Sequence, residues 1–151
     1  WFATTLAPAP SHLLELGAGQ GSIPMLLAWR FPELRVTAIE AQAESAARFA
    51  RSAHYNGMED RLDLRCGDLR DPTCWPPARS QDLVTANPPY FEAGTAAQSP
   101  VAQRDQARIT RRGGLESYLR AVAHALAETD SPQALKLLDD YAKLMQKQQP
   151  N

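Results

Sequence analysis

Short apolar runs with the character of strands alternate with stretches of helical periodicity along the first half of this chain. Each run is five residues long and is followed by turn or helix signals. We therefore predict four strands, over His12–Leu16, Arg35–Ile39, Arg61–Arg65 and Asp82–Ala86. Strands that alternate with helices through short connections favour an α/β fold with an open parallel sheet, whose ligands bind at the carboxyl ends of the strands.

Two helices are predicted between the first three strands. Apolar residues recur at helical spacing over Ile23–Phe31, and Pro32 ends that helix. Ala43–Asn56 is the second helix, with Gly57 after it as the stop signal. Its apolar face is predicted to consist of Ala46, Ala47, Phe49, Ala50 and Ala53.

Two loops and two further helices complete the pattern. The proline-containing segment Asp71–Arg79 and the small, polar segment Glu92–Val101 are predicted to be loops. Helices are predicted over Leu115–Ala127 and, after an N-cap at Ser131, over Ala134–Gln146.

Composition bounds the class of protein. A chain of 151 residues that is 44% hydrophobic can bury the core of one domain. The net charge of −1 gives no global attraction to nucleic acid, so such a partner requires a local basic patch. Cys66 and Cys74 lack the spacing of a metal cluster, and we expect reduced thiols and no metal. No apolar run approaches the roughly 20 residues that span a bilayer, which predicts a soluble cytoplasmic protein.

A glycine-rich turn follows the first strand and precedes a helix. Gly17, Gly19 and Gly21 form a G-x-G-x-G pattern, in which glycines let the backbone approach a ligand closely. A dinucleotide fingerprint requires glycine at the position of Ser22, so the dehydrogenase interpretation is disfavoured.

Three acidic residues end successive strands around this turn. Glu15 precedes the first glycine, where a carboxylate would bind a cationic, amino-acid-like ligand. Glu40 closes the second strand, where a carboxylate would accept hydrogen bonds from ribose hydroxyls. Asp68 follows the third strand and would accept from an adenine amine. The alternative for Glu40 is a solvated strand-end residue, and for Asp68 a turn or cap residue.

Asn87, Pro88, Pro89 and Tyr90 follow the fourth strand and are predicted to carry the chemistry. The prolines stiffen the backbone, so the Pro88 carbonyl and the Asn87 side chain present two acceptors. Two acceptors hold both hydrogens of a planar NH2 group while its lone pair turns toward an electrophile, and Tyr90 stacks on the flat substrate. A plain proline turn is the alternative.

Glu15 to Gly21 followed by Asn87 to Tyr90 resembles the class I amino-methyltransferases, which implies a Rossmann-like sheet and S-adenosylmethionine as donor. With Phe91 and the segment up to the helix at Leu115, the chain is similar to bacterial tRNA adenine N6-methyltransferases that act on an anticodon-adjacent adenine of valine tRNA. The resemblance covers residues 1–127. It implies cofactor contacts by Glu15, Gly17, Gly19, Glu40 and Asp68 and catalysis by Asn87, Pro88 and Tyr90.

The sequence departs from that family after the Leu115 helix. Where the family's seven-stranded sheet has its fifth strand, a helix containing lysine is predicted, so we expect a sheet that is incomplete in its C-terminal half. All thirteen basic residues before Ser131 are Arg, and the three after it are Lys. We therefore expect a methyltransferase core over residues 1–130 and a helical tail of separate origin over residues 131–151, although a short segment can differ by chance. Trp1 in place of methionine predicts that the sequence begins inside a longer protein.

An arginine-rich stretch follows the tetrapeptide and gives a local charge excess of +3. Phosphate contact by this stretch is predicted, and a solvated helix start is the alternative. Its arginines are Arg104, Arg108, Arg111, Arg112 and Arg120, against Asp105 and Glu116. The leading hypothesis is N6-methylation of adenine in tRNA, with Phe91 and the first four arginines at the RNA. The alternatives are a protein glutamine N5-methyltransferase and a truncated domain that binds the cofactor without activity.

Overall fold

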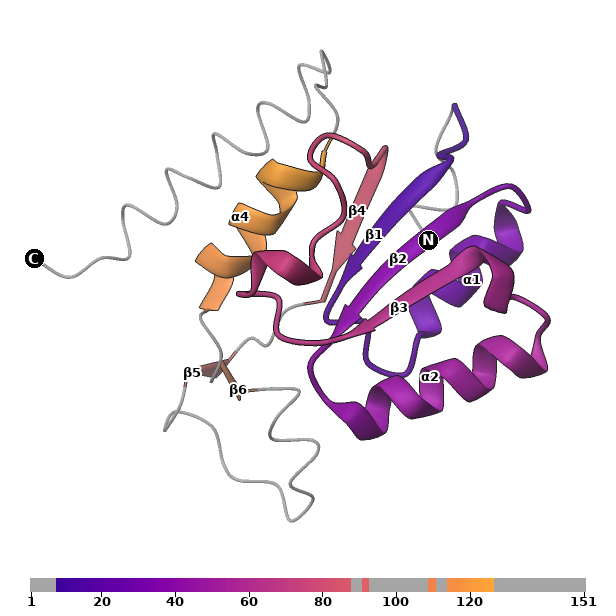
Figure 1. Ribbon diagram of the computed structural model, residues 1–151, viewed down its shortest axis with the longest axis horizontal. Helices are drawn as coiled ribbons and strands as arrows, with labels where there is room; N and C mark the ends of the chain where they lie inside the picture. The colour runs from indigo at the N-terminus through magenta and orange to yellow at the C-terminus, as the bar shows by residue number, and fades with distance from the viewer. Residues whose placement is uncertain (1–7, 88–90, 93–108, 111–113, 127–151) are drawn as a thin grey trace, which may run out of the picture.

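The computed structural model describes residues 8–87, 91–92, 109–110 and 114–126, with side chains for 8–87 and 116–126. Four strands form one parallel sheet in the order β3-β2-β1-β4, which confirms the predicted α/β class (Figure 1). The strands are β1 (His12–Leu16), β2 (Arg35–Glu40), β3 (Leu62–Cys66) and β4 (Leu83–Ala86). The predicted third and fourth strands began one residue too early. A 3-10 turn over Glu59–Arg61 delays β3, and Asp82 binds the start of β1 instead of joining β4.

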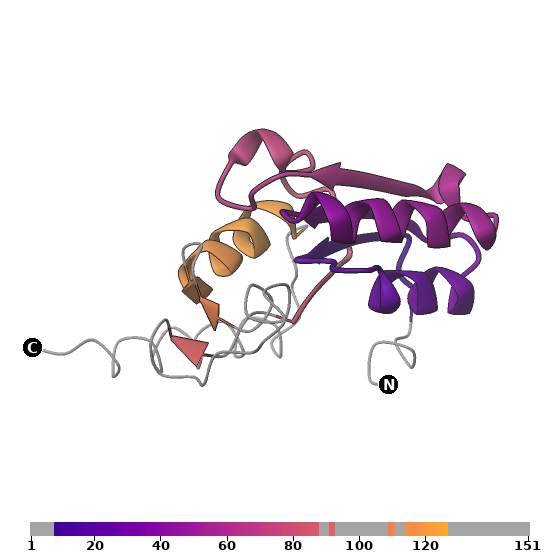
Figure 2. The same cartoon turned by 90° about the horizontal axis from the view of Figure 1, so that it is seen from below.

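Helices cover both faces of the sheet (Figures 1 and 2). The helices α1 (Ser22–Arg30) and α2 (Ala43–Tyr55) pack on one face, and α4 (Gly114–Ala125) packs on the other. Successive side chains of a strand point to opposite faces, so β1 contributes to both cores. The α1/α2 core includes Leu13, Leu27, Val36, Ala38 and Phe49, and the α4 core includes Leu14, Leu16, Ile39, Ala121 and Ala125.

The buried face of α2 differs from the predicted one. Ser45 is buried together with Ala46, Phe49 and Ala53, whereas Ala47 and Ala50 are exposed. Phe49 sets the centre of the contact, and helical geometry places the two exposed alanines on the side that faces away from it. The prediction was therefore wrong for Ala47 and Ala50. The helix does end as predicted, at Asn56 and at Gly57 with φ of 60°.

Beyond β4 the described backbone forms two short elements before α4. The strand β5 (Phe91–Glu92) pairs in parallel with β6 (Ile109–Thr110), so the predicted loop was wrong at its first residue, Glu92. The rest of that loop, the predicted helix over Ala134–Gln146, the residues 131–151 as a separate tail and the missing half of the sheet lie outside the described residues. They stay predictions.

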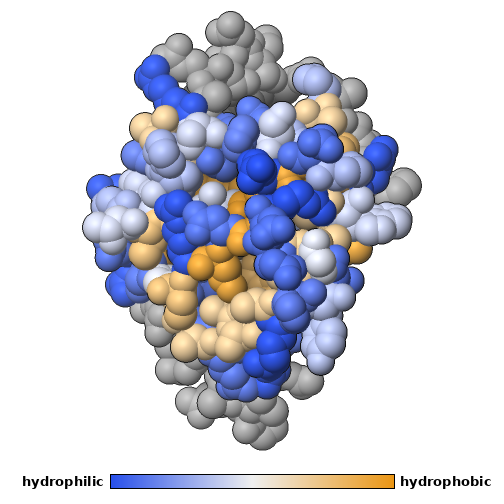
Figure 3. Space-filling view, turned by 45° about the vertical axis from the view of Figure 1, so that its right-hand side comes forward, coloured by the Kyte–Doolittle hydropathy of each residue, from blue (hydrophilic) through white to orange (hydrophobic). Residues whose placement is uncertain are grey.

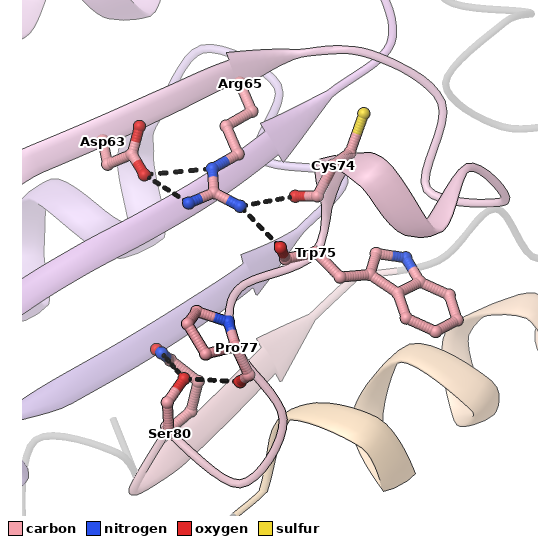
Figure 4. A network of polar contacts seen from close by, with 7 residues as sticks. Asp63, Arg65, Cys74, Trp75, Pro77 and Ser80 are labelled. Carbon is pink, nitrogen blue, oxygen red and sulfur yellow. Dashed lines mark hydrogen bonds and ion pairs between the residues drawn. The ribbon is translucent and has the colours of Figure 1, made fainter.

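Arg65 of β3 ties the loop between β3 and β4 to the sheet (Figure 4). Its Nη1 donates to the carbonyl oxygens of Cys74 and Trp75 at 3.0 and 2.7 Å, and its Nε and Nη2 donate to Asp63. The Trp75 ring in turn packs against His124 of α4, with 5.0 Å between ring centroids. The loop, predicted as irregular and containing only one 3-10 turn at Pro72–Cys74, thereby fixes α4 against the sheet.

The surface of the described part combines polar residues with a few large apolar ones. Figure 3 shows hydrophobic side chains that reach the surface between hydrophilic ones. Ile23, Leu26 and Trp29 of α1 are exposed, as is Tyr55 of α2. Within the described ranges, no helix has the length and hydrophobicity needed to cross a bilayer.

Candidate active site

The glycine-rich turn lies at the carboxyl end of β1, in the centre of the sheet. Its glycines have positive φ, 69° at Gly17, 57° at Gly19 and 84° at Gly21. The N–H groups of Gly17 and Ala18 donate to the carbonyl oxygen of Ile39 in β2, at 2.9 and 3.0 Å. These bonds hold the turn against the neighbouring strand, so it is a fixed surface for a ligand.

The three glycines have different surroundings. A Cβ at Gly21 would lie 2.1 Å from the Phe49 ring, so packing alone requires glycine there. A Cβ at Gly17 would lie 2.9 Å from the Tyr118 hydroxyl oxygen. At Gly19 nothing lies within 4 Å of an added Cβ. The open side of the turn is therefore at Gly19.

The Glu40 carboxylate links the end of β2 to this turn. It is only 5% exposed, and its Oε2 accepts from the Gly19 N–H at 2.7 Å while its Oε1 accepts from the Gln42 N–H at 2.7 Å. Each carboxylate oxygen has two lone pairs, so both retain capacity for a ligand hydroxyl. Glu40 therefore positions the turn and can also bind a ligand. The alternative interpretation, a solvated residue at the end of a strand, does not describe this buried and hydrogen-bonded carboxylate.

Glu15 is the most buried carboxyl group of the site, at 1% exposure. It accepts a hydrogen bond from the Thr85 hydroxyl of β4. Burial raises the pKa of Glu15 from 4.5 to about 7, and the bond from Thr85 opposes that rise only in part. A positive charge placed beside Glu15 would favour the ionised form. The residue is thus suited to a cationic ligand group.

Asp68 forms the turn after β3. Its Oδ1 accepts from the Arg70 N–H at 2.9 Å, and its Oδ2 is 2.7 Å from Nη2 of Arg70. Asp68 thus has the turn-forming role that the sequence analysis gave as the alternative to binding an adenine amine. The cofactor role of Asp68 stays a prediction.

Tyr118 of α4 belongs to the site, although the sequence analysis did not identify it. Burial raises its pKa to about 12, and the nearby carboxylates of Glu40, Asp68 and Glu15 add to the rise. The hydroxyl that approaches Gly17 therefore lies in the field of all three acids. Tyr118 lies on the apolar face of α4 with Ala121 and Val122. The sequence pattern therefore marks it as a core residue and gives no sign that its hydroxyl reaches the site.

Asn87 leaves β4 beside the glycine-rich turn. Ala86 pairs with Leu16, so Asn87 and Gly17 follow adjacent strand ends, and Asn87 is exposed. Phe91 has its backbone in β5. Pro88, Pro89 and Tyr90 lie outside the described residues, as do Arg104, Arg108, Arg111 and Arg112. Arg120 is exposed on α4. The roles of these residues stay predictions.

The arrangement is suited to a ligand with positive charge and hydrogen-bond donors. Glu40 is bonded to the glycine turn, and the carboxyl groups of Glu15, Glu40 and Asp68 all act on the Tyr118 hydroxyl that approaches Gly17. In the described part of the chain, no group of three His, Cys, Asp or Glu side chains is placed to hold a metal ion.

Comparison with known families and proteins gives a consistent result. The methyltransferase domain family matches residues 13–114. A tRNA1(Val) (adenine(37)-N6)-methyltransferase of Porphyromonas gingivalis is 36% identical over 120 residues, which are 78% of this chain and 46% of the relative. The enzyme of the same name from Enterobacter sp. (strain 638) is 29% identical over 120 residues, 78% of this chain and 47% of the relative.

A relative with a different substrate matches the chain as well. The ribosomal protein uL3 glutamine methyltransferase of Burkholderia pseudomallei is 33% identical over 108 residues, which are 69% of this chain and 35% of the relative. The chain spans about half the length, or less, of these curated relatives.

Solved structures share the fold. The cyclase SpnF has a TM-score of 0.51 and 21% identity, over 82% of this chain and 38% of the cyclase. This likeness shows the arrangement of helices and strands. A cyclase with the same arrangement also shows that the reaction has to be argued from the site.

Proposed function

Since this chain belongs to the methyltransferase domain family, we propose that its site binds S-adenosylmethionine and that the whole protein methylates a planar amino nitrogen. The observation that carries the proposal is the set of carboxyl groups at the carboxyl ends of β1, β2 and β3, beside the glycine turn. Glu15, Glu40 and Asp68 come from consecutive strands of one sheet edge, where ligands of such folds bind.

The chemistry of the donor set fits this cofactor. S-adenosylmethionine has a positive amine, ribose hydroxyls and an adenine amine, which match Glu15, Glu40 and Asp68 in the order of their strands. When bound, the cofactor supplies a methyl group on a positively charged sulfur. Glu40 holds Gly19 in place through the 2.7 Å bond, so the open side of the turn is set before the ligand arrives.

For the methyl acceptor we propose adenine N6 in tRNA. Asn87 follows β4 beside Gly17, at the carboxyl ends of the strands that carry the carboxyl groups. With Pro88, Pro89 and Tyr90 it would orient the amine, and orientation is the main requirement because a methylated, cationic nitrogen loses its proton readily. The names of the P. gingivalis and Enterobacter relatives support this substrate.

Phosphate contact is the second part of the tRNA proposal. Phe91 and the arginines of the following segment would hold the RNA near the residues that orient the amine, Asn87 to Tyr90. These arginines are Arg104, Arg108, Arg111 and Arg112.

Transfer of labelled methyl groups to unmodified tRNA tests the proposal. The 151-residue chain should label the tRNA, and Asn87→Ala should lose at least about 100-fold of that activity because the amine is no longer oriented. Asn56→Ala is the matched control, since Asn56 is an exposed asparagine at the end of α2. Equal labelling by Asn87→Ala and the wild type would refute the assigned role of Asn87.

A protein glutamine is the second candidate substrate. Its side-chain amide also presents a planar NH2 group, and the uL3 glutamine methyltransferase relative favours it. Ribosomal protein and tRNA offered together distinguish the two. Label that resists nuclease and is released by protease would establish the glutamine reaction, whereas nuclease-sensitive label would establish the tRNA reaction.

A further inference from the structure

The Tyr118 hydroxyl is a hydrogen-bond donor placed directly at the candidate cofactor site. It approaches Gly17 so closely that a Cβ there would be 2.9 Å from the oxygen. In the part of the chain that the structure describes, no residue accepts a hydrogen bond from this hydroxyl. Tyr118 packs, like Trp75 and Val122, against the core cluster on the α4 face of the sheet.

Few other donors of the glycine turn remain for a ligand. The Gly17 and Ala18 N–H groups donate to the Ile39 carbonyl oxygen. The Gly19 N–H donates to Glu40, and the Gly21 N–H donates to the Ala18 carbonyl oxygen. Four of the backbone donors that a glycine turn usually offers to an anion are thus used within the protein.

Among the described residues, the charged groups that act on the Tyr118 hydroxyl are three acids. Glu15, Glu40 and Asp68 repel a negative group, yet the amino-acid portion of S-adenosylmethionine has a carboxylate as well as an amine. A neutral hydroxyl that keeps its proton at physiological pH is the kind of partner such a carboxylate needs. Burial, and after it the three acids, raises the pKa of Tyr118 to about 12, so the hydroxyl keeps its proton.

We propose that the Tyr118 hydroxyl donates a hydrogen bond to the carboxylate of the amino-acid portion of the cofactor. The inference rests on the proposed function, because it requires that S-adenosylmethionine is the ligand. It assigns to α4 a cofactor contact in addition to its packing against the sheet.

Calorimetry with two ligands tests the contact. S-adenosylhomocysteine has the carboxylate, and 5′-methylthioadenosine has the same nucleoside without the amino-acid portion. Tyr118→Phe should bind S-adenosylhomocysteine roughly 10- to 100-fold more weakly than the wild type, the range for a hydrogen bond to a charged group. Its affinity for 5′-methylthioadenosine should be unchanged. Tyr55→Phe is the matched control, because Tyr55 is 87% exposed on α2.

Each other outcome has a distinct meaning. Equal loss for both ligands would show that Tyr118 acts through the fold, and unchanged or tighter binding of S-adenosylhomocysteine would show that the hydroxyl makes no such bond; either result overturns the inference. Urea unfolding of Tyr118→Phe identifies a loss that comes from the fold. A folded wild-type chain that binds neither ligand would instead refute the proposed function.

Discussion

Replacing Glu15 with glutamine removes a charge that the fold buries at 1% exposure. Glutamine has nearly the same shape, and its amide oxygen can still accept from the Thr85 hydroxyl. In the folded chain burial raises the pKa of Glu15 from 4.5 to about 7. A carboxyl group with a raised pKa stabilises the fold below its unfolded pKa, and this contribution is lost as pH rises to the folded pKa. The window is therefore pH 4.5 to 7.

The expected magnitude follows from the two pKa values. Each pKa unit corresponds to about 1.4 kcal/mol, so ionising Glu15 in the folded chain costs about 3 kcal/mol. The wild type should lose about that much unfolding free energy between pH 4.5 and 7, and Glu15→Gln should not. The unfolding free energy of Glu15→Gln minus that of the wild type should therefore be about 3 kcal/mol larger above pH 7 than at pH 4.5.

Urea unfolding followed by circular dichroism across this pH range measures the effect. The difference between Glu15→Gln and the wild type should rise with pH and become constant above about pH 8. Glu33→Gln, at an exposed glutamate in the turn before β2, is the matched control for the substitution itself. A difference for Glu15→Gln that does not change with pH would refute the account of the buried carboxyl group.

Three further predictions concern the turn and its support. Gly21→Ala should lower the unfolding free energy by about 3 kcal/mol in urea melts, because its Cβ would meet Phe49 at 2.1 Å, whereas Gly57→Ala, with a similar φ and open space, should lose only about 1 kcal/mol. Gly19→Ala should remain folded but bind S-adenosylhomocysteine at least about 10-fold more weakly in calorimetry, since its Cβ enters the open side of the turn; undiminished binding would show that the ligand lies elsewhere. Arg61→Met should lower the unfolding free energy by about 2 kcal/mol, because Nη1 donates to carbonyl oxygens at and just after the end of α1, and an unchanged urea midpoint would contradict this.

The elements were predictable because they depend on local pattern. The apolar runs located all four strands of the main sheet, and the placement of Glu40 and Asn87 at strand ends followed from them. The contacts made by these side chains were not predictable. The bond from Gly19 to Glu40 depends on how β1 and β2 align, and Tyr118 reaches Gly17 from a helix about 100 residues further along the chain. Such partners are decided by packing between distant segments, and no local spacing encodes them.

The position of β1 between β2 and β4 has a consequence for the rate of folding. β1 pairs with β2 across one short helical connection, but Asp82, just before β4, binds His12 from a sequence separation of 70 residues. Closing the longer loop costs about 1 kcal/mol more in chain entropy, and contacts at such separation slow the search for the native state. We expect β1, α1 and β2 to form first and β4 to dock late. Until then the edge of β1 next to Glu15 is open, so newly made chains are most prone to mispairing at the strand that later carries the site.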